Sequence, residues 1–135
     1  MKYEVLSLRP LFKLLSMFVT KEFTFDSAHF LPNYHGKCED MHGHTYRLQV
    51  TMNGPIDADG LVIDFALIKK VVKKEVLEKL DHKLINDIIK VASVENMAVW
   101  IWEQLNGNAE FPKSVKLHEI KIWETPNSSV TYHGK

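Results

Sequence analysis

The segment at positions 45–52 constrains the fold most, because polar and apolar side chains alternate along all of it. This period of two is typical of a β-strand with one buried face and one solvated face. The apolar members of the segment are Tyr46, Leu48, Val50 and Met52. His42 and His44 precede them in the same register, so one continuous strand would put both imidazoles on the apolar face.

A third histidine, His29, ends another segment with strand-like alternation. Alternation places His29 on the same side as Phe25 and Ser27. Three neutral imidazoles with no obvious fourth protein ligand form the donor set of a zinc ion that keeps one coordination position open for chemistry. The pattern therefore predicts a Zn2+ site made by His29, His42 and His44.

Cys38 is the single cysteine of the chain and lies in an expected loop at residues 31–40. Three interpretations are open: a buried structural thiol, a fourth zinc ligand, or a catalytic thiolate favoured by the neighbouring Lys37. Cys38→Ala would release zinc in the second case, and would keep zinc but abolish activity in the third. Because one cysteine cannot form an intrachain disulfide, a cytoplasmic location is expected.

The predicted order of elements is strand, strand, helix, helix, strand, strand, which indicates an α+β fold with two helices on one face of a four-stranded antiparallel sheet. The expected strands are residues 18–25, 45–52, 115–124 and 128–133, with a break at 53–55 and a turn at 126–127. Asp64 is the expected N-cap of a helix that ends near residue 80, and Ser93 that of a helix over 94–105.

Residues 17–135 are expected to form a single catalytic domain, and residues 1–16 a non-catalytic extension. Arg9, Pro10 and Lys13 interrupt the apolar residues of that extension, which is too short to span a bilayer. Met17 is an alternative start. The chain has 17 Lys and Arg against 17 Asp and Glu, so no net charge favours nucleic acid or an anionic membrane.

Two further acidic positions are candidates for chemistry. Asp81 directly precedes His82 and can fix the tautomer of that imidazole for proton transfer, although a histidine at a helix end is an equal alternative. Glu124 shares strand parity with Ile120 and Ile122, so it could accept a guanidine-like ligand edge from a half-buried face. Its alternative is a solvated carboxylate at a strand end.

The remaining histidines carry less information. His35 and His133 lie beside glycines in expected loops and are assigned no metal role.

Taken together in their order along the chain, these motifs resemble the 6-pyruvoyltetrahydropterin synthase family over about residues 18–133. The queuosine-pathway branch, the 6-carboxytetrahydropterin synthases, is the most similar. The motifs that carry the resemblance are Phe25-Asp26-Ser27-Ala28-His29, Cys38 with His42-Gly43-His44, Val62-Ile63-Asp64-Phe65, Leu80-Asp81-His82, Leu84-x-Asn86, Glu95-Asn96 and Glu124-Thr125.

The resemblance implies a tunnelling fold (T-fold) in which three sheets join edge to edge into a barrel and two trimers stack into a homohexamer. Active sites would lie between subunits. The implied zinc ligands are His29, His42 and His44; the implied catalytic residues are Cys38, Asp81 and His82; the implied substrate-binding residues are Glu124, which anchors the pterin, with Ser93 and Glu39.

The resemblance also implies a zinc-dependent lyase that converts 7,8-dihydroneopterin triphosphate to 6-carboxytetrahydropterin, acetaldehyde and triphosphate. Glu39, directly after Cys38, is a local departure from the family pattern. Some family members resemble this arrangement and use the glutamate as the catalytic base. A 6-pyruvoyltetrahydropterin product or a folate-directed 6-hydroxymethyl-dihydropterin product is therefore an alternative. A zinc-stabilised pterin-binding protein without turnover is a further alternative, of another class.

Overall fold

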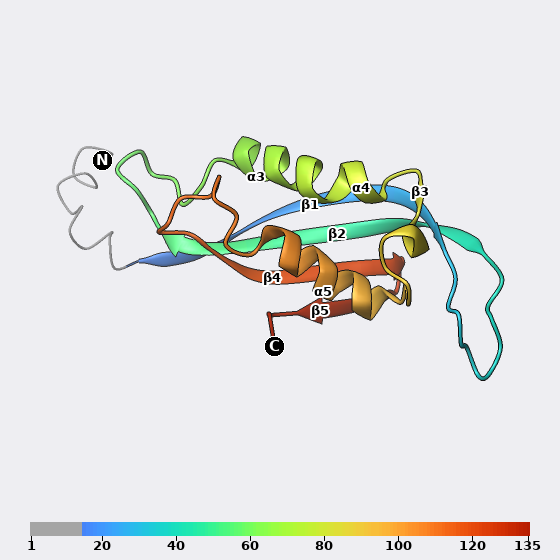
Figure 1. The fold of residues 1–135 in the computed structure, drawn as a ribbon. Helices are drawn as coiled ribbons and strands as arrows, with labels where there is room; N and C mark the ends of the chain where they lie inside the picture. The colour runs from blue at the N-terminus through green and yellow to red at the C-terminus, as the bar shows by residue number, and fades with distance from the viewer. Residues whose placement is uncertain (1–14) are drawn as a thin grey trace.

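The computed structural model describes residues 15–135, so the expectations for residues 1–14 of the N-terminal extension lie outside the described part. One sheet carries the helices on one of its faces (Figure 1). The long strands β1 (Ser16–His29) and β2 (His42–Pro55) pair antiparallel along their whole length. β4 (Lys116–Thr125) pairs with the other edge of β2, and β5 (Ser128–Tyr132) pairs with β4. The α+β class is confirmed.

The four predicted antiparallel strands are present, but the sheet has one strand more than predicted. A short fifth strand, β3 (Lys83–Leu84), lies parallel to the end of β1, and the spatial order is β3-β1-β2-β4-β5. The chain returns to this edge after the first helix, where the His82 backbone N–H donates to the Asp26 carbonyl oxygen at 2.6 Å. A two-residue strand has too little alternation to be recognised in a sequence.

The two long strands also extend beyond their predicted limits. β2 passes through residues 53–55, which were expected to break it. Gly54 allows a close approach there, since a Cβ at this position would lie 3.0 Å from the Ser114 carbonyl oxygen. Pro55 is the last residue of β2 and lies opposite Ser16, the first of β1, where proline is tolerated.

Both predicted helices are present with their predicted caps. The first runs through α3 (Phe65–Val72), a π-helical turn η1 (Lys73–Leu77) and α4 (Glu78–Leu80), and Asp64 accepts from the Ala66 backbone N–H at its start. The second is α5 (Val94–Leu105). No helix of residues 15–135 is long and apolar enough to cross a membrane.

The alternation of β2 is confirmed by burial. Its apolar residues Tyr46, Leu48, Val50 and Met52 are fully buried and belong to the core between sheet and helices. The opposite face of the sheet is polar; there Arg47 forms an ion pair with Glu22 at 2.9 Å. This partition brings the histidines at the end of β1 and the start of β2 to the core side of the sheet, at its open end.

Candidate metal and substrate site

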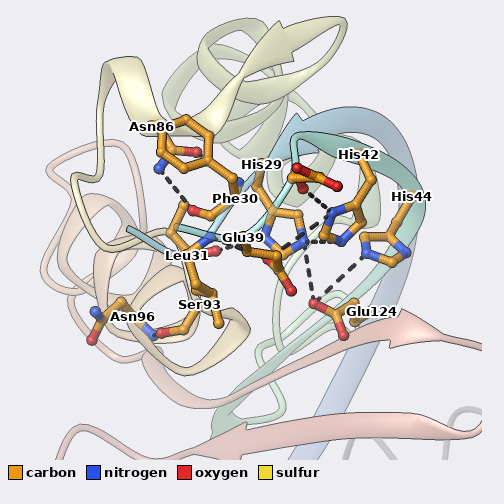
Figure 2. Close-up of polar contacts among 12 residues, drawn as sticks. His29, Phe30, Leu31, Glu39, His42, His44, Asn86, Ser93, Asn96 and Glu124 are labelled. Carbon is orange, nitrogen blue, oxygen red and sulfur yellow. Dashed lines mark hydrogen bonds and ion pairs between the residues drawn. The ribbon is translucent and has the colours of Figure 1, made fainter. Parts of the chain in front are cut away.

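Three imidazoles converge where β1 ends and β2 begins (Figure 2). The register places His29 directly opposite His42, and Ser27 opposite His44. The Nε2 atoms of His29 and His42 are 3.1 Å apart, and one ring nitrogen from each of the three histidines lies within 4.8 Å of the others. Two strands and their pairing are therefore enough to assemble the trio that the sequence predicted.

Hydrogen bonds to backbone carbonyls fix the tautomers of two of these rings. His29 Nδ1 lies 2.6 Å from the Ala92 carbonyl oxygen, and His42 Nδ1 lies 2.8 Å from that of Asp40. A carbonyl can only accept, so each Nδ1 carries the proton and each Nε2 presents a lone pair. Lone pairs that face each other at 3.1 Å repel unless a cation lies between them.

The third ring leaves a buried nitrogen without a partner. His44 Nε2 is buried and makes no hydrogen bond within the described residues. Burial lowers the pKa of His44, an effect that the nearby Glu124 carboxylate partly opposes, so the ring is neutral at pH 7. A zinc ion bound by imidazoles at about 2.0–2.1 Å holds two such nitrogens about 3.3 Å apart. The trio fits that donor set.

The Glu124 carboxylate reaches the trio from β4. Its Oε1 lies 3.4 Å from His29 Nε2 and 3.8 Å from His44 Nε2. The pairing of β4 with β5 is irregular between Trp123 and Thr125, at the position of Glu124. The structure thus brings together the three predicted metal ligands and the predicted pterin anchor within one chain.

A tyrosine lies beneath the histidines. Tyr46 is fully buried, and its ring contacts those of His29 and His44 at centroid distances of 5.9 and 5.5 Å. Its hydroxyl has no hydrogen-bond partner among the described residues. Burial, assisted by the charge of Glu124, raises the pKa of Tyr46 well above its usual range, so the phenol stays neutral.

The loop between β1 and β2 carries Cys38 and Glu39 in different settings. Cys38 is exposed, and its Sγ lies 3.7 Å from the Glu39 carbonyl oxygen. The Glu39 side chain turns inward: Oε1 accepts from the Leu31 backbone N–H at 3.1 Å and lies 4.0 Å from His42 Nδ1 (Figure 2). Glu39 is thus engaged in holding the loop closed, and the thiol is accessible.

Asp81 and His82 follow the first helix. Asp81 Oδ1 accepts from the Asp26 backbone N–H at 2.9 Å and lies 3.0 Å from His82 Nδ1. The Asp26 N–H, followed by His82, holds the pKa of Asp81 below its ordinary value. His82 is exposed and has a φ of 59°, in the left-handed region that favours glycine. No hydrogen bond or ion pair within residues 15–135 joins this pair to Cys38.

Two residues fix the backbone around the site. The Asn86 side chain accepts from the Phe30 backbone N–H at 3.0 Å and donates to the carbonyls of Phe30 at 2.9 Å and Lys90 at 3.0 Å. The motif Leu84-x-Asn86 includes this residue, but the sequence did not predict its hydrogen bonds to the backbone. Ser93 accepts from the Asn96 backbone N–H at 3.1 Å, so its hydroxyl is engaged as the N-cap of α5. The carbonyl of Ala92, which orients His29, has no sequence signal.

Open hollows adjoin His44 on two sides. One, of about 560 Å³, is lined by residues that include Ser27, His44 and His82. The other, of about 430 Å³, is lined by residues that include His44, Trp123 and Glu124. Both volumes are in the range of small-molecule sites. The second hollow combines an aromatic wall with a carboxylate and a prospective metal ligand, as a flat heterocycle with N–H donors requires.

Comparisons with known proteins point to one family. A family model described as 6-pyruvoyl tetrahydropterin synthase matches residues 18–135. The 6-carboxy-5,6,7,8-tetrahydropterin synthase of Haemophilus influenzae is 32% identical over 84% of this chain and 96% of its own. The 6-pyruvoyl tetrahydrobiopterin synthase of Dictyostelium discoideum is 36% identical over 89% of this chain and 98% of its own. The dihydroneopterin monophosphate aldolase of Pyrococcus furiosus is 40% identical over 75% and 83%.

A solved structure extends the likeness to three dimensions. The 6-pyruvoyl tetrahydropterin synthase of Caenorhabditis elegans superposes with a TM-score of 0.77 at 28% identity, covering 90% of this chain and 97% of that one. The T-fold predicted for the single chain is confirmed.

Proposed function

The chain belongs to the 6-pyruvoyl tetrahydropterin synthase family, and from that membership we propose that it is a zinc-dependent 6-carboxy-5,6,7,8-tetrahydropterin synthase acting on 7,8-dihydroneopterin triphosphate. The observation that carries the proposal is the convergence of three imidazoles, two with their Nε2 lone pairs facing inward, beside the Glu124 carboxylate. The implied product enters queuosine biosynthesis. The single cysteine supports a cytoplasmic location.

The zinc would be held by His29, His42 and His44, and when bound it supplies Lewis-acid stabilisation of negative charge on substrate oxygens. Glu124 accepts the amino and ring N–H groups of the pterin, and so directs the side chain of the substrate toward the histidines. Tyr46 supplies the buried floor of the site and keeps water from reaching it from the core side.

Proton transfer is assigned to Cys38 and to the pair Asp81 and His82. The Asp81 carboxylate lies within hydrogen-bond distance of His82 Nδ1, which leaves Nε2 to take or give the proton. The φ of His82 is compatible with this role, since residues held in the left-handed region cluster at active sites. The exposed Cys38 thiol is the partner that exchanges protons with the substrate side chain.

Because no hydrogen bond or ion pair among residues 15–135 joins Cys38 to His82, we infer that the relay is completed by a neighbouring subunit of a homohexamer. Among residues 15–135, β5 and the stretch of β1 that β3 does not cover are strand edges at the two sides of the sheet, and pairing between subunits would cover them. Exposed apolar residues near the site, Ile88 and Val91, support a subunit contact at this end.

A second candidate is aldolase-type cleavage that leaves a 6-hydroxymethyl product. The likeness to the Pyrococcus furiosus aldolase and the presence of Glu39 beside Cys38 favour it. The engagement of the Glu39 side chain with Leu31 weighs against Glu39 as the base. A 6-pyruvoyl product and binding without turnover complete the set of alternatives.

Incubation of the zinc-loaded protein with 7,8-dihydroneopterin triphosphate, followed by mass spectrometry of the products, separates these activities. Acetaldehyde with a 6-carboxypterin supports the proposal. A pyruvoyl or hydroxymethyl pterin would assign one of the other two reactions, and unchanged substrate would leave a binding role. Cys38→Ala and Glu39→Gln, assayed side by side, identify which residue of the loop is needed for turnover.

A further inference from the structure

Two histidines and a glutamate gather on the sheet away from the His29, His42 and His44 trio. They are His118 and Glu119 of β4 and His133, which directly follows β5. One ligand atom from each lies within 4.8 Å of the other two, and His133 Nε2 is 2.9 Å from Glu119 Oε2. The proposed activity uses none of these three residues.

A β-bulge turns two successive side chains of β4 to the same face. The register of β2 with β4 steps from Thr51 opposite Glu119 to Met52 opposite Leu117, which leaves His118 without a partner on β2. Leu117 and Ile120 both belong to the core, although they are three residues apart. A regular strand cannot bury both, so the bulge places His118 and Glu119 together on the polar face.

Neighbouring residues hold the ring of His118 and the backbone at His133 in place. Phe18 of β1 stacks on His118 at a centroid distance of 4.2 Å and an interplanar angle of 27°. On the other side of the sheet, Tyr132 packs against Trp102 at 5.8 Å. Gly134 follows with a φ of 92° and lies so close to Trp102 that a Cβ would be 2.5 Å from its ring. His133 is thereby fixed between two anchored residues.

We propose that His118, Glu119 and His133 form a second divalent-cation site, selective for zinc and similar late first-row metals. Two imidazoles and one carboxylate are the donor set of a three-ligand zinc site completed by water. The 2.9 Å separation of His133 Nε2 and Glu119 Oε2 needs to widen by only about 0.4 Å to match two ligands of one tetrahedral zinc. The bound ion joins β4 to the segment after β5 and stabilises that end of the sheet.

The site is independent of the trio. Glu119 and Glu124 are on the same strand, and five residues of β-strand span about 16 Å. His133, which the sequence pattern left without a metal role, is a ligand here because the bulge on β4 brings partners to it. The bulge is defined by the pairing of β4 with β2, and its sign in the sequence is the spacing of three between the apolar residues Leu117 and Ile120.

Zinc stoichiometry tests the proposal directly. The full chain is stripped with a chelator, loaded with Zn2+ alone, passed through a metal-free column and assayed for zinc per chain by mass spectrometry. The unaltered protein is expected to keep two equivalents, and His118→Asn and His133→Asn one each. His35→Asn is the matched control, because His35 is exposed, belongs to neither cluster and has a φ of 52° that asparagine accepts.

His42→Asn gives the converse measurement. This variant is expected to keep the zinc ion of the second site and to lose that of the trio. The difference in zinc per chain between the unaltered protein and His133→Asn therefore reports on the second site whether or not the trio binds zinc. Equal zinc content in these two proteins would overturn the proposal. His133 is exposed, so His133→Asn gives a readable result even if His118→Asn fails to fold.

Discussion

Replacing Glu124 by Gln keeps the size of the side chain and removes its charge, which separates two roles open to this carboxylate. Oε1 lies 3.4 Å from His29 Nε2 and 3.8 Å from His44 Nε2, close enough for Glu124 to serve as a fourth metal ligand. Oε2 has no protein partner among residues 15–135, which suits a carboxylate that awaits N–H donors from a substrate.

If Glu124 anchors the pterin, the variant loses charge-assisted hydrogen bonds to the ring. A hydrogen bond to a charged group contributes about 1.5–3 kcal/mol. The carboxylate would accept two such bonds from the pterin, and the glutamine amide of the variant would keep part of their energy, so the net loss of binding free energy is about 3 kcal/mol. This corresponds to a fall of about 150-fold in kcat/KM. The larger share should be a rise in KM, because the ring is bound in the ground state as well as in the transition state.

Steady-state kinetics together with zinc content per chain decide between the roles. Unchanged zinc with reduced kcat/KM is the expected result for Glu124→Gln. Glu22→Gln is the control, since this carboxylate is on the polar face of the same sheet and binds Arg47. Loss of zinc in Glu124→Gln would identify a metal ligand, and unaltered kinetics would remove the anchoring role; either result refutes the reasoning.

Substitutions at three further positions, Asn86, His82 and Asp81, test the surroundings of the site. Asn86→Ala should lower the free energy of unfolding by about 3 kcal/mol in urea titrations, because three backbone groups lose their hydrogen-bond partner. The control Asn108→Ala leaves one backbone group without its partner and should lower it by about 1 kcal/mol. His82→Gly and His82→Ala should both lose most activity, yet the glycine variant should be about 1 kcal/mol more stable, since glycine adopts a φ of 59° without the strain that the alanine Cβ introduces; equal stabilities would contradict this. Asp81 has a pKa lowered in the folded state, so its contribution to stability is present above about pH 4 and is lost as the pH falls through the folded-state pKa. Thermal melts should therefore show a steeper acid loss for the unaltered protein than for Asp81→Asn, and parallel profiles would exclude the linkage.

The parts of the fold that follow from local periodicity were predictable. Alternation in 45–52 placed Tyr46 and Leu48 in the core, and both caps, Asp64 and Ser93, accept the hydrogen bonds expected of them. The errors lie where tertiary contacts override local signals. β2 continues through Gly54 because a neighbouring backbone packs against it, and β3 exists because the edge of β1 offers a partner to two residues that have no strand signal alone.

The site divides in the same way. Parity along two strands identified the trio, and parity with Ile120 and Ile122 pointed Glu124 toward it, because a side-chain direction is set by position alone. The groups that orient these side chains are backbone carbonyls, which the sequence does not distinguish. The carbonyls of Asp40 and Ala92 fix which nitrogen of His42 and His29 faces inward, and any residue type has a carbonyl. The sequence therefore shows which side chains can bind a metal, whereas the tautomers and orientations of their rings are set by the folded backbone. Ala92→Gly should leave zinc binding at the proposed metal site unchanged as long as the backbone carbonyl keeps its position, because this carbonyl, and not the Ala92 side chain, orients His29.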